Sequence, residues 1–131
     1  MTAPISNLIL KMQTKNRNDS TEVSFTIAAS AADGRSETLN LGTARAWAIQ
    51  MPAAWTTAAL TLRASSDGVT WADVYKSGSE YSIDAQPSRY IILSNDLIGA
   101  QFVQFRSGTA GTPVQQAGDR ALKLVCHTRL L

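Results

Sequence analysis

Apolar and polar residues alternate with a period of two along much of this chain. Near its start, Val23, Phe25 and Ile27 fall on one face and polar residues fall on the other. The same alternation recurs in residues 59–65 and in the C-terminal residues 120–130. A period of two is typical of strands that bury one face and expose the other. The pattern therefore predicts strands at these places.

Turn signals separate the alternating segments at intervals of roughly 8–12 residues. Examples are an Asp-Gly pair at residues 33–34, another at residues 67–68, and the Gly-, Pro- and Thr-rich residues 108–119. Residues 95–100 can form one helical turn, but no segment has the pattern of a long helix. Because a parallel sheet needs long crossover connections, we predict an all-β fold. Its expected form is an antiparallel β-sandwich, of the jelly-roll or galactose-binding-like kind.

The tryptophans and one apolar run carry more specific predictions. Trp47 and Trp71 lie inside alternating segments, so both are expected in the core. Residues 89–94 are almost continuously apolar, which is typical of a strand buried on both faces. Residues 51–60 have the pattern of a loop between two strands, so their Trp55 is expected to be partly exposed. It is therefore a candidate for contact with a partner protein.

Length and composition fit one domain. The chain has 131 residues, of which 44% are hydrophobic, which is enough for one packed core. Polar residues 13–20 set apart the N-terminus, so we place an N-terminal arm or first strand at residues 1–20 and the β-sandwich domain at residues 21–131. The arm has an apolar run suited to pairing with a strand edge of another subunit. This run consists of Leu8, Ile9 and Leu10.

Neither a membrane nor a nucleic-acid partner is expected. The apolar run of the arm is too short for a signal peptide, and no segment approaches the ~20 apolar residues that span a bilayer. We therefore expect synthesis in a cytoplasm. The net charge is only +2, with scattered basic residues. Charged residues make up 17%, so the surface must carry many Ser, Thr, Gln and Ala, which suits burial in an assembly but also an ordinary β-protein.

Residue types that carry catalysis or bind metals are few. Cys126 is the only cysteine and His127 the only histidine. Neighbours on a strand point to opposite faces, so the two side chains should diverge, with Cys126 as a small buried hydrophobe. The carboxylates are dispersed, and no Gly-x-Ser-x-Gly motif is present. We therefore expect no enzyme, no cofactor, no metal site and no small-molecule ligand.

The stretch SSDGVTW, residues 65–71, nearly matches the Asp-box pattern Ser-x-Asp-x-Gly-x-x-Trp, with one residue missing between Asp67 and Gly68. An aspartate at this place can accept hydrogen bonds from nearby backbone amides, and a glycine can adopt a positive φ. We interpret the stretch as the turn of a β-hairpin, with Trp71 packing into the core. A ligand-binding loop is the alternative.

Residues 45–129, about two-thirds of the chain, resemble small virion proteins of tailed bacteriophages and related prophages. The resemblance is carried by the "MPAAWT-AALTL" segment, the "SSDG-TW-D-Y" hairpin, the "SRYI-L" strand and "RSGT-GTPV-Q" near the C-terminus. The shortened SDGVTW departs from relatives, which often carry extra residues there. The resemblance implies a β-sandwich component of the virion.

Our leading hypothesis for its place in the virion is a capsid decoration (cement) subunit, and a tail or head-fibre component is the other possibility. Such a subunit would bind the major capsid protein or other virion proteins, and we expect it to be a homo-oligomer. The expected contact elements are the N-terminal arm and two loops, at residues 51–57 and 109–116. The contact residues are Leu8, Ile9, Leu10, Pro52, Trp55, Thr109, Thr112, Pro113 and Gln115. The alternative is a carbohydrate-binding or host-adhesion module of a tail or head fibre, which would use Trp55, Tyr75, Tyr81 and Asp67.

Overall fold

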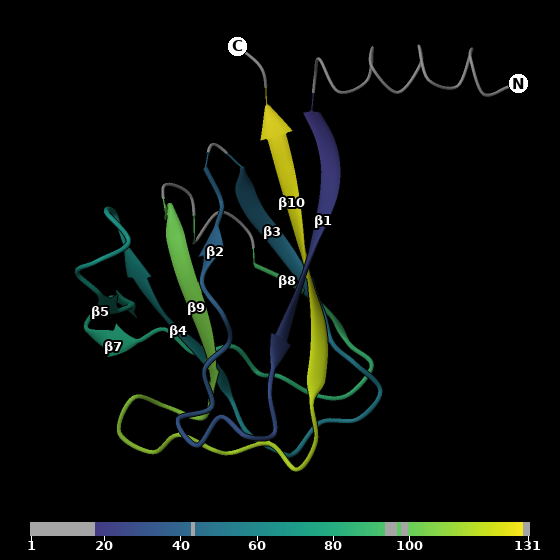
Figure 1. Ribbon diagram of the computed structural model, residues 1–131. Helices are drawn as coiled ribbons and strands as arrows, with labels where there is room; N and C mark the ends of the chain where they lie inside the picture. The colour runs from purple at the N-terminus through teal and green to yellow at the C-terminus, as the bar shows by residue number, and fades with distance from the viewer. Residues whose placement is uncertain (1–17, 43, 94–96, 98–99, 130–131) are drawn as a thin grey trace, which may run out of the picture.

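The computed structural model describes residues 18–42, 44–93, 97 and 100–129, and two antiparallel four-stranded sheets face each other in it (Figure 1). In order across sheet A, the strands are β1 (Asn18–Ile27), β10 (Arg120–Arg129), β3 (Arg45–Gln50) and β8 (Tyr90–Ile92). In order across sheet B, they are β2 (Leu39–Asn40), β9 (Phe102–Ser107), β4 (Leu60–Ser65) and β5 (Ala72–Asp73). A separate hairpin consists of β6 (Tyr75–Lys76) and β7 (Ser79–Glu80).

These sheets confirm the prediction of an all-β, antiparallel β-sandwich, because every strand pairing in the described residues is antiparallel. The finer assignment to a jelly-roll or galactose-binding-like topology stays a prediction. No helix in the described part of the chain is long and apolar enough to cross a membrane. The helical turn expected at residues 95–100 falls largely outside the described residues. The N-terminal arm also falls outside them up to residue 17, and β1 begins before the boundary expected after residue 20.

The inward-facing side chains of the two sheets form one core. Phe25 of β1 stacks on Phe105 of β9, with ring centroids 4.8 Å apart and planes inclined by 17°. Residues that the alternation predicted to face inward are almost completely buried: Ile27, Leu60, Leu62, Leu122, Leu124 and Cys126. Burial of apolar surface stabilises a fold by about 25 cal/mol per Å², so this layer is the main source of stability.

A β-bulge in sheet A overturns the prediction that Trp47 lies in the core. The register between β3 and β10 shifts, because Ala46 pairs with Cys126 whereas Ala48 pairs with Val125. Trp47 is therefore the extra residue on β3, and a bulge re-aims side chains. The indole is 37% exposed and lies against the ring of His127, on the side of the sheet away from the core.

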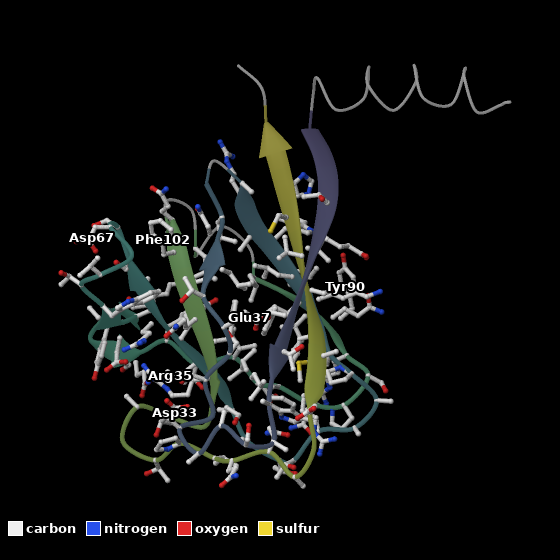
Figure 2. The ribbon with its side chains drawn as sticks, in the orientation of Figure 1. Asp33, Arg35, Glu37, Asp67, Tyr90 and Phe102 are labelled. Atoms are coloured by element: carbon white, nitrogen blue, oxygen red, sulfur yellow. The ribbon has the colours of Figure 1, made fainter. Side chains whose placement is uncertain are left out.

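The exposure of the outer face of β8 overturns the prediction that residues 89–94 form a strand buried on both faces. β8 pairs only with β3 and forms an edge of the sheet. Ile91 packs against the core, whereas Tyr90 and Ile92 point to the outer face and are each 54% exposed. Figure 2 shows Tyr90 on the side of sheet A that faces away from sheet B. The strand is therefore half-buried.

Candidate functional site

The Asp67 turn has the structural role that the sequence predicted. The Oδ1 atom of Asp67 accepts hydrogen bonds from the backbone N–H groups of Val69 and Thr70, each at 2.8 Å, and from the Ser65 hydroxyl. The bonds from the Thr70 and Val69 amides lower the pKa of Asp67 to about 2. Gly68 supplies a positive φ of 78° that completes the turn. One carboxylate oxygen is thus committed to holding the loop in shape.

Trp71 does not reach the core, so that part of the prediction is wrong. The indole is half-buried outside the core, and the Arg63 guanidinium carbon lies 4.8 Å from its ring centroid. The Nε–H of Arg63 donates a hydrogen bond of 2.7 Å to Gln104. Burial, followed by the charges of Arg35 and Arg106, lowers the pKa of Arg63. The outer face of sheet B is therefore a polar, arginine-rich surface.

Arg106 is the buried member of this surface, with only 7% of its side chain exposed. Its Nη1 atom lies 3.1 Å from Asp73 Oδ1, and its Nη2 atom lies 2.8 Å from Glu80 Oε2. Its Nε–H donates to the Thr61 hydroxyl at 3.0 Å. The same Glu80 oxygen accepts the backbone N–H of Ala110 at 3.0 Å. This network fastens the β6–β7 hairpin to sheet B and to the loop that follows β9.

Two of the loops expected to contact a partner are joined to each other. Gln116 is 2% exposed, and its amide mimics a strand partner. Its Oε1 atom accepts the backbone N–H of Thr56 at 2.8 Å, and its Nε2 atom donates to the Thr56 carbonyl at 3.0 Å. Arg120 donates to the same Oε1 atom at 3.0 Å. The sequence predicted both loops but gave no sign of this link.

A third loop, at residues 28–35, is tied to the same place. Asp119 accepts the backbone N–H of Ala29 at 2.8 Å, and Gln115 donates to the Ala29 carbonyl at 2.7 Å. Gly34 accepts the backbone N–H of Ser107 at 2.9 Å. We name residues 28–35, 51–59 and 108–119 the loop end. In Figure 1 these loops lie together at the end of the sandwich opposite the start of β1.

The exposed surface of the loop end is made largely of small, uncharged side chains. Its charged side chains are engaged within it, because Asp33 pairs with Arg35 at 2.7 Å and Asp119 binds Ala29. The exposed uncharged residues are Ser30, Ala32, Ala53, Ala54, Thr57, Ala110, Gly111, Thr112, Pro113, Gln115 and Ala117. A partner can therefore approach closely without burying an unpaired charge.

The residues predicted to contact a partner differ in their exposure. Thr112, Pro113 and Gln115 are exposed at the loop end, and Pro52 and Thr109 are half-buried. The expected exposure of Trp55 is wrong, since the side chain is only 8% exposed and its indole N–H donates to the Ala58 carbonyl at 3.1 Å. The tryptophan anchors its own loop. The remaining three, Leu8, Ile9 and Leu10, lie outside the described residues.

Cys126 and His127 diverge as the strand pattern predicts. Cys126 is completely buried, and burial raises the pKa of its thiol. His127 lies on the other face of β10, where its ring meets Trp47 edge-on at 5.2 Å. Within the described ranges, no group of three or more His, Cys, Asp or Glu side chains is placed to hold a metal ion.

The sequence did not reveal a second exposed surface, which we name the β8 patch: Trp47, Tyr90 and Ile92. All three side chains lie on the outer face of sheet A along β3 and β8. Ala48 and Val125 face the same side and are buried. The sequence offered one signal for this patch: Tyr90 and Ile92 flank Ile91 and so fall on the opposite face of the strand. Because the whole run is apolar, this alternation could not be distinguished from a strand buried on both faces.

Comparison with known proteins identifies neither a family nor a function. No protein-family model matches the chain, and no curated protein matches it. Among solved structures, the chain is similar to the SPBc2 prophage-derived protein YomS, with 17% sequence identity and a TM-score of 0.42. The similarity covers 84% of this chain and 96% of that one. A likeness this low does not identify a shared function.

Proposed function

We propose that this chain is a structural protein of a tailed-bacteriophage virion, a decoration (cement) subunit that binds the capsid shell through the loop end. The resemblance of residues 45–129 to small virion proteins supports the phage particle as its location. In this proposal the chain is made in the host cytoplasm and works by adhesion, with many copies adding modest contacts.

The observation that carries the proposal is the construction of the loop end. Three loops from distant parts of the chain are fixed to one another by side chain–backbone hydrogen bonds, of which the paired Gln116–Thr56 bonds are the most buried. Preorganised loops lose little conformational entropy when they bind. Their exposed surface is made largely of small, uncharged side chains, and its charged side chains have partners within the loop end, so desolvation on contact with another protein costs little.

The carbohydrate-binding alternative lacks a comparable observation. Trp55, its principal ring, is buried, and Asp67 is held in its own turn. Tyr75 is 62% exposed, and Tyr81 is half-buried. The Arg63 guanidinium lies over one face of the Trp71 ring, with its carbon 4.8 Å from the ring centroid.

The proposal is tested in the particle itself. An image reconstruction of virions from the phage that encodes this chain should show the sandwich on the shell, with the loop end against capsid subunits. Density on the tail or fibres, or absence of the chain from purified virions by mass spectrometry, would contradict the decoration role.

A binding experiment tests the surface. Purified chain added to shells that lack it should bind at least about tenfold more weakly after Thr112→Glu, because the substitution buries an unpaired charge. Val69→Glu is the matched control, because Val69 is 81% exposed on the Asp67 turn. Equal binding by both variants would exclude the loop end as the contact.

A further inference from the structure

Strand β8 presents unpaired backbone groups along the edge of sheet A. In the ladder with β3, Leu93 N–H donates to the Trp47 carbonyl and Met51 N–H donates to the Arg89 carbonyl, each at 2.8 Å. Residues 89, 91 and 93 therefore bond inward, toward β3. Antiparallel ladders alternate, so the N–H and C=O groups of Tyr90 and Ile92 point outward. No backbone group in the described residues pairs with them.

The side chains beside this edge are apolar. Trp47 is 37% exposed, and Tyr90 and Ile92 are 54% exposed each. Together they expose roughly 300 Å², which is comparable with the largest apolar patch on a typical monomer. A free strand edge with an apolar flank is a template for another strand.

The opposite edge of the same sheet is protected. On β1, the outward N–H of Thr26 is bound by the Glu37 carboxylate at 3.0 Å. Glu22 and Ser24, on the same strand, put a charge and a polar group on its outer face. Charges and side-chain caps are devices that keep edge strands from pairing. β8 has neither along Tyr90–Ile92, so the two edges differ in their capacity to bind.

We propose that β8 pairs with β8 of a second copy of this chain, antiparallel across a two-fold axis at Ile91. Sheet A then continues from one copy into the other. In this register Tyr90 lies opposite Ile92 of the second copy, and both present outward backbone groups. The pairing makes roughly four backbone hydrogen bonds, and two aromatic–β-branched side-chain pairs form on the outer face.

A second copy suits this edge because the surface is self-complementary. The same two residues supply donors, acceptors and apolar side chains to both sides of the axis, as a two-fold interface requires. The β8 patches of both copies then lie side by side. The apolar area of each patch is below the ~800 Å² per partner of a standard interface, so we expect a weak dimer that dissociates on dilution. This dimer goes beyond the shell-binding role and uses different residues from it.

The register makes a specific prediction for charged variants. Tyr90→Lys with Ile92→Lys sets like charges opposite each other in both cross-strand pairs. Tyr90→Glu with Ile92→Lys sets opposite charges there. Both positions are exposed, so neither pair of substitutions disturbs the monomer core. We expect the first double variant to weaken the dimer at least about 100-fold, and the second to retain most of it.

Sedimentation velocity of the full chain at about 100 μM, with Val69→Lys as the matched control, measures both effects. A monomeric wild-type chain would overturn the proposal. So would equal weakening by the two double variants, since only the two-fold register distinguishes them, and so would a dimer that neither variant changes. The outcome is independent of the capsid assays, because a chain absent from virions can still dimerise through β8.

Discussion

Replacing Arg106 with methionine removes a buried cation while keeping most of its length. The guanidinium is 7% exposed, and its partners Glu80 and Asp73 are 18% and 39% exposed. Arg106→Met leaves the Glu80 carboxylate mostly buried without its counter-charge, and it removes the donor to the buried Thr61 hydroxyl. Breaking a buried ion pair from one side costs about 3–5 kcal/mol. Because Asp73 is partly solvated, we expect a loss of about 3 kcal/mol.

The assay is urea unfolding with a parallel thermal scan, in which that loss lowers Tm by about 10 °C. The matched control is Arg89→Met, whose pair with Asp84 is exposed at 3.6 Å and should be worth under about 0.5 kcal/mol. Adding Asp73→Asn and Glu80→Gln to Arg106→Met removes the stranded charges, so it should restore part of the loss. The reasoning is refuted if Arg106→Met costs no more than the control, or if the added substitutions restore nothing.

Three further predictions concern the turns and the loop end. A Cβ on Gly34, where φ is 69°, would lie 2.7 Å from the Ser107 carbonyl oxygen, whereas a Cβ on Gly42 would meet nothing within 4 Å. Gly34→Ala should therefore lower the free energy of unfolding in urea by about 2 kcal/mol more than Gly42→Ala does. Equal losses would contradict the close packing around Gly34. The pKa of Asp67 is lowered to about 2 from 3.8, so the ionised carboxylate stabilises the turn fully above about pH 4 and this contribution is lost as the pH falls through 2. The carboxyl carbon should therefore titrate near 2 by NMR, and a titration near 3.8 would contradict the role of the turn hydrogen bonds. Gln116→Leu leaves the buried N–H and C=O groups of Thr56 without their hydrogen-bond partner, so it should lower the free energy of unfolding by about 2–4 kcal/mol in a thermal scan. Gln115→Leu, at the exposed surface, should lower it by under about 1 kcal/mol. Similar losses for the two variants would show that the buried amide is not what joins the loops.

Alternation along the chain was enough to predict the sandwich and most of its inward-facing residues. The direction of side chains such as Phe25, Leu62 and Leu124 depends only on local geometry, because successive residues of a strand point to opposite faces of the sheet. The Asp67 turn was predictable for the same reason, since its hydrogen bonds span only a few residues. The two loops predicted to contact partners, at residues 51–57 and 109–116, are loops in the structure.

What the sequence left undetermined depends on distant strands. Trp47 lies outside the core because β3 carries one extra residue opposite β10, and the sequence of β3 alone does not indicate this bulge. Residues 89–94 have the same apolar pattern whether or not another layer covers the outer face of the sheet, and Tyr90 and Ile92 are exposed on that face. Trp55 is buried because its loop is fastened by Gln116, at a separation of 60 residues from Thr56. The β8 patch was missed for these reasons.

The most direct test of the account is a nuclear Overhauser measurement on a mixed sample of labelled and unlabelled chain. A two-fold pairing of β8 places the Cα atoms of the two Ile91 residues about 4.5 Å apart, so the account predicts a strong intermolecular contact between their α-protons. An intermolecular contact from β8 to a different segment, or none at concentrations where the chain is dimeric, would contradict it.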